Sequence, residues 1–377
     1  MSVVHDIIRR FEEEVQDPLK QVEQARANGK KTIGCIPYFA PVELVYAANM
    51  HPIELWGGGS LTGTAGSYYP AFYCSLLFTL MERALDGSYD ELSGVIVPTT
   101  CDGLRNLEEN WKFARPDANI IDFVQPAVRD TREAHGYLVG QLKHVATRLE
   151  EISGNKITER TLRESIAIYN LQRQSMRQFS AIAAKHADVI TPSVRKAVYA
   201  AGRSMPVEEH IALVGELISC LSYEPEYVFP GKKVILTGIL VDSPSLLTEF
   251  ERNDIAVVGD LTVAESARYA IDVPGRIDPF DSLAELWANI EGVSVALDPY
   301  KKRGELLSDL ARERDADGVV ACVVKFCEEE EFDMPVLKQQ LDVEHIPFLM
   351  LEIESQDVFN EQVATRIQAF KEMLDTF

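Results

Sequence analysis

Short apolar runs alternate with amphipathic helical segments in two separate parts of this chain. The runs of the first part lie within residues 32–36, 53–56, 93–103 and 119–126, and those of the second lie within residues 232–242, 255–260, 318–326 and 346–354. Strands that alternate with helices form a parallel sheet with helices on both faces. The sequence therefore predicts an α/β fold with two parallel-sheet domains of the flavodoxin or Rossmann type.

A helical region is expected between the two sheets. Apolar residues recur there at helical spacing, which is typical of a buried helix face: Leu162, Ile166, Tyr169, Met176, Phe179 and Ile182. The predicted organisation is an N-terminal helix and linker at residues 1–30, a first α/β domain at 31–128, a helical region at 129–228 and a second α/β domain at 229–377. We expect a functional site in the cleft between the two α/β domains.

The charge of the chain limits its possible partners. The 377 residues carry a formal net charge of −22, whereas nucleic acids and anionic membranes attract a positive protein surface. The N-terminal stretch MSVVHDIIRRFEEEV is charged and amphipathic, unlike a signal peptide. No apolar run has the length of a membrane span. We expect a cytoplasmic protein that binds neither nucleic acid nor membrane.

Six cysteines occur in the chain, and two of them stand where an apolar strand meets a loop. Cys101 follows the run GVIVPTT, and Cys327 follows GVVACVVKF. Cys74 lies in YYPAFYCSLL, directly before an apolar helix. Sites in open parallel sheets form outside the carboxyl ends of the strands. Two domains that face each other across a cleft are therefore expected to bring these three thiols together.

Other residues near these thiols have simpler expected roles. Cys322 lies inside a strand and Cys220 lies in a helix rich in Leu and Ile, so both are expected to be core residues. Asp102 is expected to be the N-cap of the helix that follows Cys101. The acidic run at residues 328–331 is expected to be a solvated loop.

Several chemistries suit such thiols, and their spacing does not decide among them. Structural zinc sites usually contain closely paired cysteines, but the nearest pair here is Cys322 and Cys327. A nucleophilic cysteine needs one thiol and a base, an iron–sulfur cubane uses several thiolates, and scattered core cysteines are the simplest alternative. No GxGxxG or Walker A loop is present, so the sequence indicates neither nicotinamide nor ATP binding.

Four segments, in order along the chain, carry a family resemblance. They are GCIPYFAPVELVYAANMHPIELWG, YYPAFYCSLL, GVIVPTTCDGLR and VVKFCEEEEFDMPVLKQQLDVEHIPFL. With these segments the chain resembles the 2-hydroxyacyl-CoA dehydratases, which are close relatives of the benzoyl-CoA reductases, and most closely their smaller β subunit. The matching segments extend over both α/β domains.

The resemblance implies an oxygen-sensitive [4Fe-4S] cluster that is held by Cys74, Cys101 and Cys327 in the cleft between the domains. Cys35 ends the first strand, and the family pattern makes a near-cluster or core role its expected one, with a fourth cluster ligand as the alternative. Some relatives contain a flavin, and no motif decides whether one binds here.

The resemblance also implies partners and a reaction. The chain would pair with a homologous α subunit as a heterodimer, and a separate ATP-dependent activator with its own iron–sulfur cluster would deliver one electron. The reaction would be syn elimination of water from an (R)-2-hydroxyacyl-CoA to give the (E)-2-enoyl-CoA through ketyl radical intermediates. The 2-hydroxyacyl-CoA substrate would mainly meet the α subunit, and this chain would relay electrons.

Two alternatives from other functional classes stay open at the level of sequence. One is a homodimeric relative that reduces small molecules at a fused double-cubane cluster. The other is a non-catalytic protein that binds a cluster.

Overall fold

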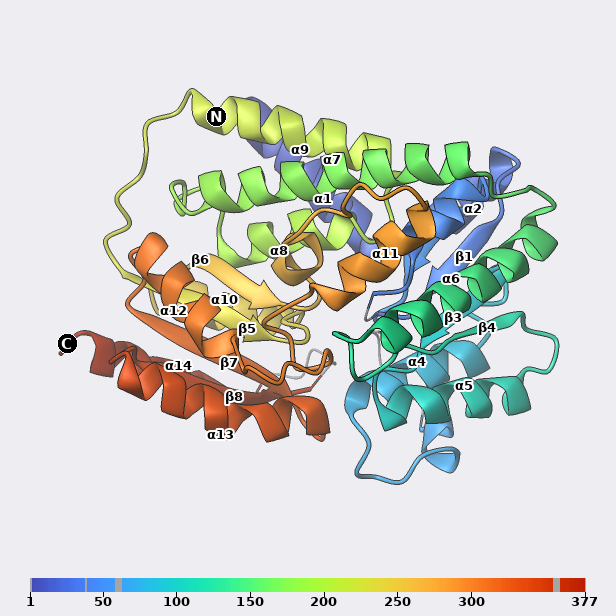
Figure 1. Ribbon diagram of the computed structural model, residues 1–377. Coiled ribbons are helices and arrows are strands. Elements are labelled where there is room, and N and C mark those ends of the chain that lie inside the picture. The colour runs from blue at the N-terminus through green and yellow to red at the C-terminus, as the bar shows by residue number, and fades with distance from the viewer. Residues whose placement is uncertain (1, 38, 58–62, 355–359, 377) are drawn as a thin grey trace.

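The computed structural model of the protein describes residues 2–37, 39–57, 63–354 and 360–376. In this part of the chain the strands form two separate four-stranded sheets, and every pair of neighbouring strands is parallel. Helices surround both sheets, and further helices lie along the top of the molecule in the view of Figure 1. The predicted α/β fold with two parallel sheets is confirmed.

The first sheet has the strand order β2-β1-β3-β4. Its strands are β1 (Thr32–Cys35), β2 (His51–Glu54), β3 (Gly94–Pro98) and β4 (Ile120–Phe123). The accompanying helices are α2 (Lys20–Ala27), α3 (Val42–Ala47), α4 (Ser75–Leu85) and α5 (Asp102–Ala114), together with the 3-10 helix η1 (Thr64–Ser67). Every residue of β1 and β3 is buried, as expected for central strands that helices cover on both faces.

The second sheet has the corresponding order β6-β5-β7-β8. Its strands are β5 (Lys232–Gly238), β6 (Ile255–Thr262), β7 (Gly318–Val324) and β8 (Phe348–Ile353). Its helices are α10 (Pro244–Arg252), α12 (Arg303–Glu313), α13 (Glu328–Val343) and α14 (Glu361–Leu374), with the 3-10 helix η2 (Ser266–Tyr269). Helix α11 (Pro279–Ala288) follows η2 in the chain but packs against α6 and α7. The sequence patterns did not predict α12.

The remaining helices are the N-terminal helix and the helices of the segment between the two sheets. They are α1 (Ser2–Gln16), α6 (Arg132–Ser153), α7 (Glu159–Ala183), α8 (Pro192–Ala201) and α9 (Val207–Ser222). The predicted apolar stripe of α7 is core: Leu162, Tyr169, Met176 and Phe179 are each at most 6% exposed. Helix α1 packs against α8 and α9, so the N-terminal helix belongs to this helical layer.

One predicted strand is displaced. The strand expected at residues 53–56 runs from His51 to Glu54 instead, because these residues pair in parallel register with Thr32–Cys35. The apolar residues Leu55 and Trp56 suggested a later end, but both are buried after the strand has finished. Burial in a loop and burial in a strand give the same hydrophobic pattern.

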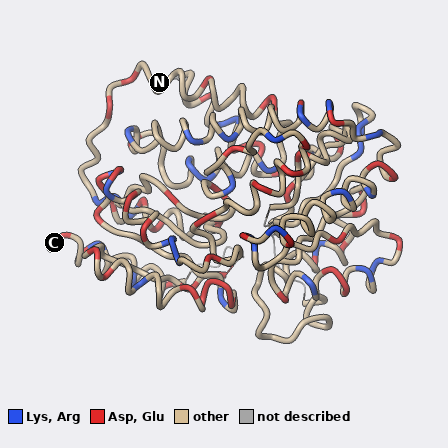
Figure 2. The backbone as a smooth tube through the Cα atoms, in the orientation of Figure 1, with Lys and Arg blue, Asp and Glu red and all other residues tan. Residues whose placement is uncertain are grey.

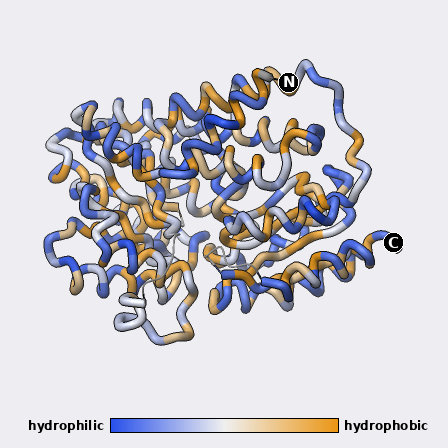
Figure 3. Tube along the Cα trace, turned by 180° about the vertical axis from the view of Figure 1, so that it is seen from behind, coloured by the Kyte–Doolittle hydropathy of each residue, from blue (hydrophilic) through white to orange (hydrophobic). Residues whose placement is uncertain are grey.

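Charge and hydropathy follow the layers of the fold. Acidic and basic residues are spread over the helices, and a run of acidic residues begins α13 (Figure 2). The opposite view shows hydrophobic and hydrophilic segments alternating along the helices (Figure 3), as expected for helices that pack through one face. No helix in the described part of the chain combines the length and apolar character needed to cross a membrane.

Ion pairs join α8 and the residues that follow it to the second domain. Arg195 of α8 pairs with Asp260 of β6, and both side chains are at most 2% exposed. Arg203 pairs with Asp242, with 3.2 Å between Nη1 and Oδ2. Each buried charge thus has an opposite charge beside it, without which its burial would be strongly unfavourable.

Glu265 lies in the same region and is 4% exposed. Burial raises its pKa from the ordinary 4.5 to about 8, the negative charge of Asp260 adds to this rise, and Arg195 opposes it. Between pH 4.5 and pH 8 the unfolded chain ionises this carboxyl group while the folded chain keeps it protonated. The folded state therefore loses stability as the pH rises through this window.

We predict that Glu265→Gln removes this loss, because glutamine resembles the protonated carboxyl group and does not ionise. Relative to wild type, the free energy of unfolding of the variant should rise by up to about 1.4 kcal/mol per pH unit across the window. Urea unfolding followed by circular dichroism from pH 5 to pH 8 measures this difference. Glu109→Gln is the control, since that side chain is 76% exposed, and a pH-independent difference for E265Q would contradict the prediction.

Candidate functional site

Cys74, Cys101 and Cys327 each occupy the N-cap position of a helix. Cys74 precedes α4, Cys101 precedes α5 and Cys327 precedes α13. The N-terminal end of a helix carries a partial positive charge and free N–H groups, which favour a negative group beside it. Figure 1 shows α4 and α5 beside the end of α13 that lies toward the first domain. The three thiols thus come from both domains.

The thiols share one electrostatic environment. Burial raises the pKa of each of them, and that of Cys101 rises to about 12. The carboxylate of Glu329, in the first turn of α13, raises the pKa of all three further. A negative charge on Cys74 also raises the pKa of Cys101 and of Cys327. These interactions cross the boundary between the two domains, so the structure brings the three predicted ligand residues together.

This arrangement holds the thiols in their neutral form when no cation is present. Ionisation of all three would place several negative charges in a poorly solvated region, beside Glu329, and only a strong positive charge can compensate such a group. Among the described residues, no group of three or more His, Cys, Asp or Glu side chains has the spacing to hold one metal ion. The thiols are neighbours without forming a compact single-ion site.

Cys101 caps α5 in place of the expected Asp102. Its Sγ accepts a hydrogen bond from the N–H of Leu104 at 3.4 Å, and Asp102 is the first helical residue. The expectation was wrong because the helix begins one residue earlier than its sequence pattern indicated. A sulfur atom therefore occupies the place that a side-chain oxygen usually takes at an N-cap.

The acidic run at residues 328–331 is helical, and the expected solvated loop is wrong. These residues form the first turn of α13, where acidic side chains interact favourably with the helix dipole. Glu330 is fully buried. Glu331 accepts a hydrogen bond from the N–H of Phe326 at 3.1 Å. Glu331 therefore holds the backbone before Cys327 through Phe326, and the acidic run itself forms the helical turn after Cys327.

Residues 37–374 match the family model described as "2-hydroxyglutaryl-CoA dehydratase, D-component". The chain belongs to this dehydratase family. The predicted family resemblance is confirmed.

Individual relatives are similar over the whole length of this dehydratase-family chain. The (R)-phenyllactyl-CoA dehydratase beta subunit of Clostridium sporogenes is 39% identical over 375 residues, which cover 99% of this chain and 100% of that protein. The lactoyl-CoA dehydratase subunit beta of Anaerotignum propionicum is 37% identical, with 99% and 100% covered. The (R)-2-hydroxyglutaryl-CoA dehydratase, subunit beta, of Acidaminococcus fermentans is 33% identical, with 98% and 99% covered.

A buried ion pair fixes the start of α13 in this dehydratase-family chain. Arg303, the first residue of α12, donates through Nη1 and Nη2 to the two carboxylate oxygens of Glu330, at 3.0 Å each. The same guanidinium group donates to Asp333 at 3.2 Å and to Thr237 of β5 at 2.8 Å. Such a two-point contact sets orientation as well as distance. The sequence analysis missed this anchor because its partners are far apart in the chain.

The residue before Cys327 has an unusual backbone conformation. Phe326 has a φ of 63°, which is costly for a bulky side chain. The hydrogen bond from its N–H to Glu331 stabilises this turn. The turn carries the chain from β7 to the N-cap thiol of Cys327.

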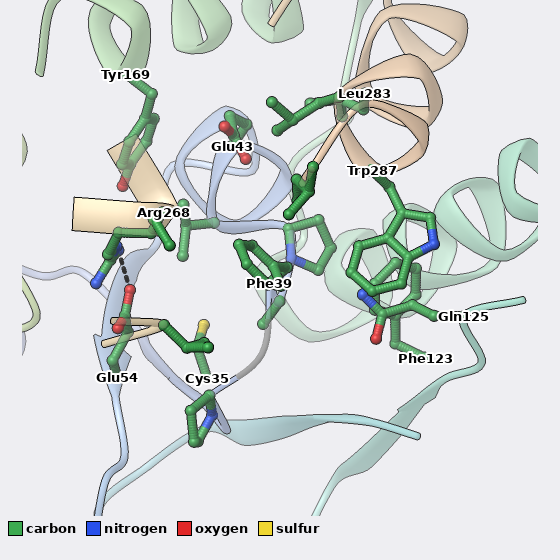
Figure 4. A pocket seen from close by; sticks show the side chains of 18 of the residues that line it. Cys35, Phe39, Glu43, Glu54, Phe123, Gln125, Tyr169, Arg268, Leu283 and Trp287 are labelled. Carbon is green, nitrogen blue, oxygen red and sulfur yellow. Dashed lines mark ion pairs between the residues drawn. The ribbon is translucent and has the colours of Figure 1, made fainter. Parts of the chain in front are cut away.

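The other cysteines lie elsewhere. Cys322 is fully buried in β7, as expected for a core residue, and Cys220 is partly buried against the core formed by α1, α7, α8 and α9. Cys35 is fully buried at the end of β1. It lines a cavity whose wall includes none of Cys74, Cys101 and Cys327 (Figure 4).

We predict that Arg303→Met strongly destabilises the protein, because it leaves the carboxylate of Glu330 buried without its cation. The loss of a partner from a buried ion pair costs about 3–5 kcal/mol. Urea unfolding at neutral pH measures the cost, and hydrogen exchange should show faster opening of the first turn of α13.

Two further variants serve as controls for this anchor. Arg312→Met, on the same helix α12, removes a guanidinium group that is 59% exposed, so it should cost less than about 1 kcal/mol. Adding Glu330→Gln to Arg303→Met removes the unpaired charge and should restore much of the stability. Equal costs for the Arg303 and Arg312 variants would show that the ion pair does not anchor α13.

Proposed function

We propose that this chain is the iron–sulfur β subunit of an (R)-2-hydroxyacyl-CoA dehydratase, which eliminates water from the substrate to give the (E)-2-enoyl-CoA. The observation that carries the proposal is the group of three thiols at the N-caps of α4, α5 and α13, whose charges interact across the two domains. Similarity to beta subunits of three dehydratases over nearly the whole chain supports the reaction class.

The residues fit a [4Fe-4S] cluster held by Cys74, Cys101 and Cys327. Iron supplies the positive charge that three poorly solvated, mutually repelling thiolates require. In a cubane each thiolate binds a different iron, so its ligands need not have the close spacing of a single-ion site. N–H groups at helix starts stabilise negative charge on sulfur, as that of Leu104 can do through its hydrogen bond to Sγ of Cys101.

When bound, such a cluster supplies one-electron transfer, which is the chemistry that dehydration at an unactivated position needs. The chain contributes the environment. Burial of Cys327 and partial burial of Cys74 and Cys101 limit the access of water. The pair of Arg303 and Glu330 holds α13 in place, and the turn at Phe326 positions Cys327. Cys327 is the ligand from the second domain, so the proposed cluster would join the two domains.

Partners complete the proposal. The substrate would bind mainly at a homologous α subunit, and an ATP-dependent activator with its own iron–sulfur cluster would supply the electron. Exposed aromatic side chains close in sequence to the thiols suit such contacts: Phe72 is 65% exposed and Phe332 is 81% exposed. Exposed aromatic residues are typical of protein interfaces.

We predict that the anaerobically purified protein holds about four iron atoms per chain, the content of one cubane. Cys74→Ser, Cys101→Ser and Cys327→Ser should each lose most of this iron, because the three thiolates hold the cluster jointly. Iron and acid-labile sulfide are measured in each variant.

The matched control for these variants is Cys220→Ser, which should keep its iron because Cys220 packs in a different core. If C220S loses iron while C101S retains it, the proposed ligand set is wrong. Colourless protein with full activity would show that the chain does not hold an iron–sulfur cluster.

We predict that Phe332→Ser weakens association with the α subunit at least tenfold, because it removes an exposed aromatic contact beside the proposed cluster site. Phe113→Ser is the control, since Phe113 is equally exposed, at 81%, but lies at the far end of α5. Sedimentation of the co-produced subunits measures the affinity. Equal effects of the two variants would show that Phe332 does not contact the α subunit. A monomer that dehydrates 2-hydroxyacyl-CoA unaided would contradict the need for an α subunit.

A further inference from the structure

A cavity of about 90 Å³ lies where both domains meet the helical layer. Its wall includes Cys35 of β1, Glu54 of β2, Tyr169 of α7, Arg268 of η2 and Trp287 of α11. None of the three proposed cluster ligands is among the residues that line it. The cavity is therefore a feature separate from the site on which the proposed function rests.

Most of the wall is apolar. Phe39 and Trp287 are in contact, with 5.7 Å between their ring centroids, and further apolar residues complete this part: Trp56, Phe123, Leu138, Leu142, Leu283, Leu286 and Ile290. Figure 4 shows Phe39 between Cys35 and Trp287, with the sulfur of Cys35 pointing into the space. A concave, mostly apolar wall with a few polar groups is the usual form of a small-molecule site.

The charged groups of the wall cancel one another. Glu54 forms an ion pair with Arg268, and Glu43 forms an ion pair with Arg173. These four residues are the only Asp, Glu, Lys, Arg or His among the described lining residues. Burial also raises the pKa of the Cys35 thiol well above its ordinary value. A charged ligand would enter without a free counter-ion, and burial of an uncompensated charge is strongly unfavourable.

Four buried donors on lining residues have no hydrogen-bond partner among the described residues. They are Nε of Arg173, Nη1 of Arg268, the hydroxyl group of Tyr269 and Nε1 of Trp287. A buried donor without a partner costs free energy, and a ligand with a hydrogen-bond acceptor can satisfy it. The wall therefore suits an uncharged molecule that is mainly apolar and carries one acceptor.

The volume limits the size of this molecule. A cavity of about 150 Å³ holds benzene, so 90 Å³ encloses roughly four non-hydrogen atoms of an apolar body. A branched aliphatic group of this size fits within the cavity, and an aromatic ring with one small substituent enters it in part.

We propose that this cavity is a binding site for a small uncharged molecule that has an aromatic or branched apolar body and one hydrogen-bond acceptor. The ligand is either a free molecule or the apolar end of a larger one. The shared chemistry of recognition is apolar contact with Phe39 and Trp287 and a hydrogen bond from the polar part of the wall.

The test compares ligands of nearly equal size that differ in one property. Benzyl alcohol has the proposed chemistry, benzoate and benzylammonium carry a charge, and toluene lacks the acceptor. Calorimetric titration of the complete anaerobically purified protein should show benzyl alcohol binding at least tenfold more tightly than either charged compound, and more tightly than toluene. Equal affinities for the neutral and charged compounds would overturn the proposal.

Variants locate the binding. Cys35→Met fills the space into which the sulfur points and should reduce the affinity for benzyl alcohol at least tenfold, whereas Cys35→Ala should retain it. Cys220→Met, the same substitution in a different core, should bind as wild type does. Unchanged affinity in C35M would place the ligand elsewhere and overturn the proposal.

A second measurement applies even if C35M does not fold. Benzyl alcohol should slow the alkylation of Cys35 by iodoacetamide in the wild-type protein and leave that of Cys220 unchanged, as peptide mass analysis will show. Absence of protection at saturating benzyl alcohol would contradict the site. A coenzyme A thioester that carries the same aromatic group then distinguishes a free ligand from the apolar end of a larger one. The thioester binds only if the cavity accepts the end of a larger molecule. Iron content, measured on the same samples, tests the proposed function separately.

Discussion

The direction of the strands is the constraint on which the candidate site depends. All strands of a parallel sheet end at one edge, and each following helix begins there, so helix N-termini and loop residues collect on one side of each sheet. In this protein both sheets are four-stranded and parallel, and the starts of α4, α5 and α13 bring Cys74, Cys101 and Cys327 into one electrostatic environment. A site built in this way needs no sequence proximity between its members.

Charge is managed differently at the two places where polar groups are buried. Around the thiols, burial, Glu329 and the thiols themselves all oppose ionisation, so the region suits an external cation. In the cavity beside Cys35, each carboxylate already forms an ion pair with an arginine, so the region suits an uncharged ligand. The same low-dielectric environment thus favours opposite kinds of ligand, because ionised thiolates would lack a counter-ion in one place, whereas every charge already has its partner in the other.

The helical layer and the second domain are held together by buried ions as well as by apolar packing. Arg195 and Asp260 join α8 of the helical layer to β6, and within the second domain Arg303 joins α12 to the first turn of α13. Such pairs contribute little net stability relative to apolar contacts, but they fix relative orientation because a displaced charge loses its partner. Orientation matters most near Cys327, where a strained residue, Phe326, leads into the N-cap.

The sequence by itself determined the fold class, the order of the elements and the family, because hydrophobic periodicity and local motifs are properties of neighbouring residues. It also selected Cys74, Cys101 and Cys327, since the end of a strand and the start of a helix are local features. It misjudged Asp102, where the helix begins one residue earlier than expected, and the acidic run at residues 328–331, which forms the first turn of a helix. The exact start of a helix depends on tertiary contacts. Only the tertiary structure decided that Glu330 is buried against Arg303 and that Cys35 lines a cavity with Arg268 and Trp287. These contacts join residues far apart in the chain, and no local pattern records which distant side chain will supply the compensating charge or the opposite wall.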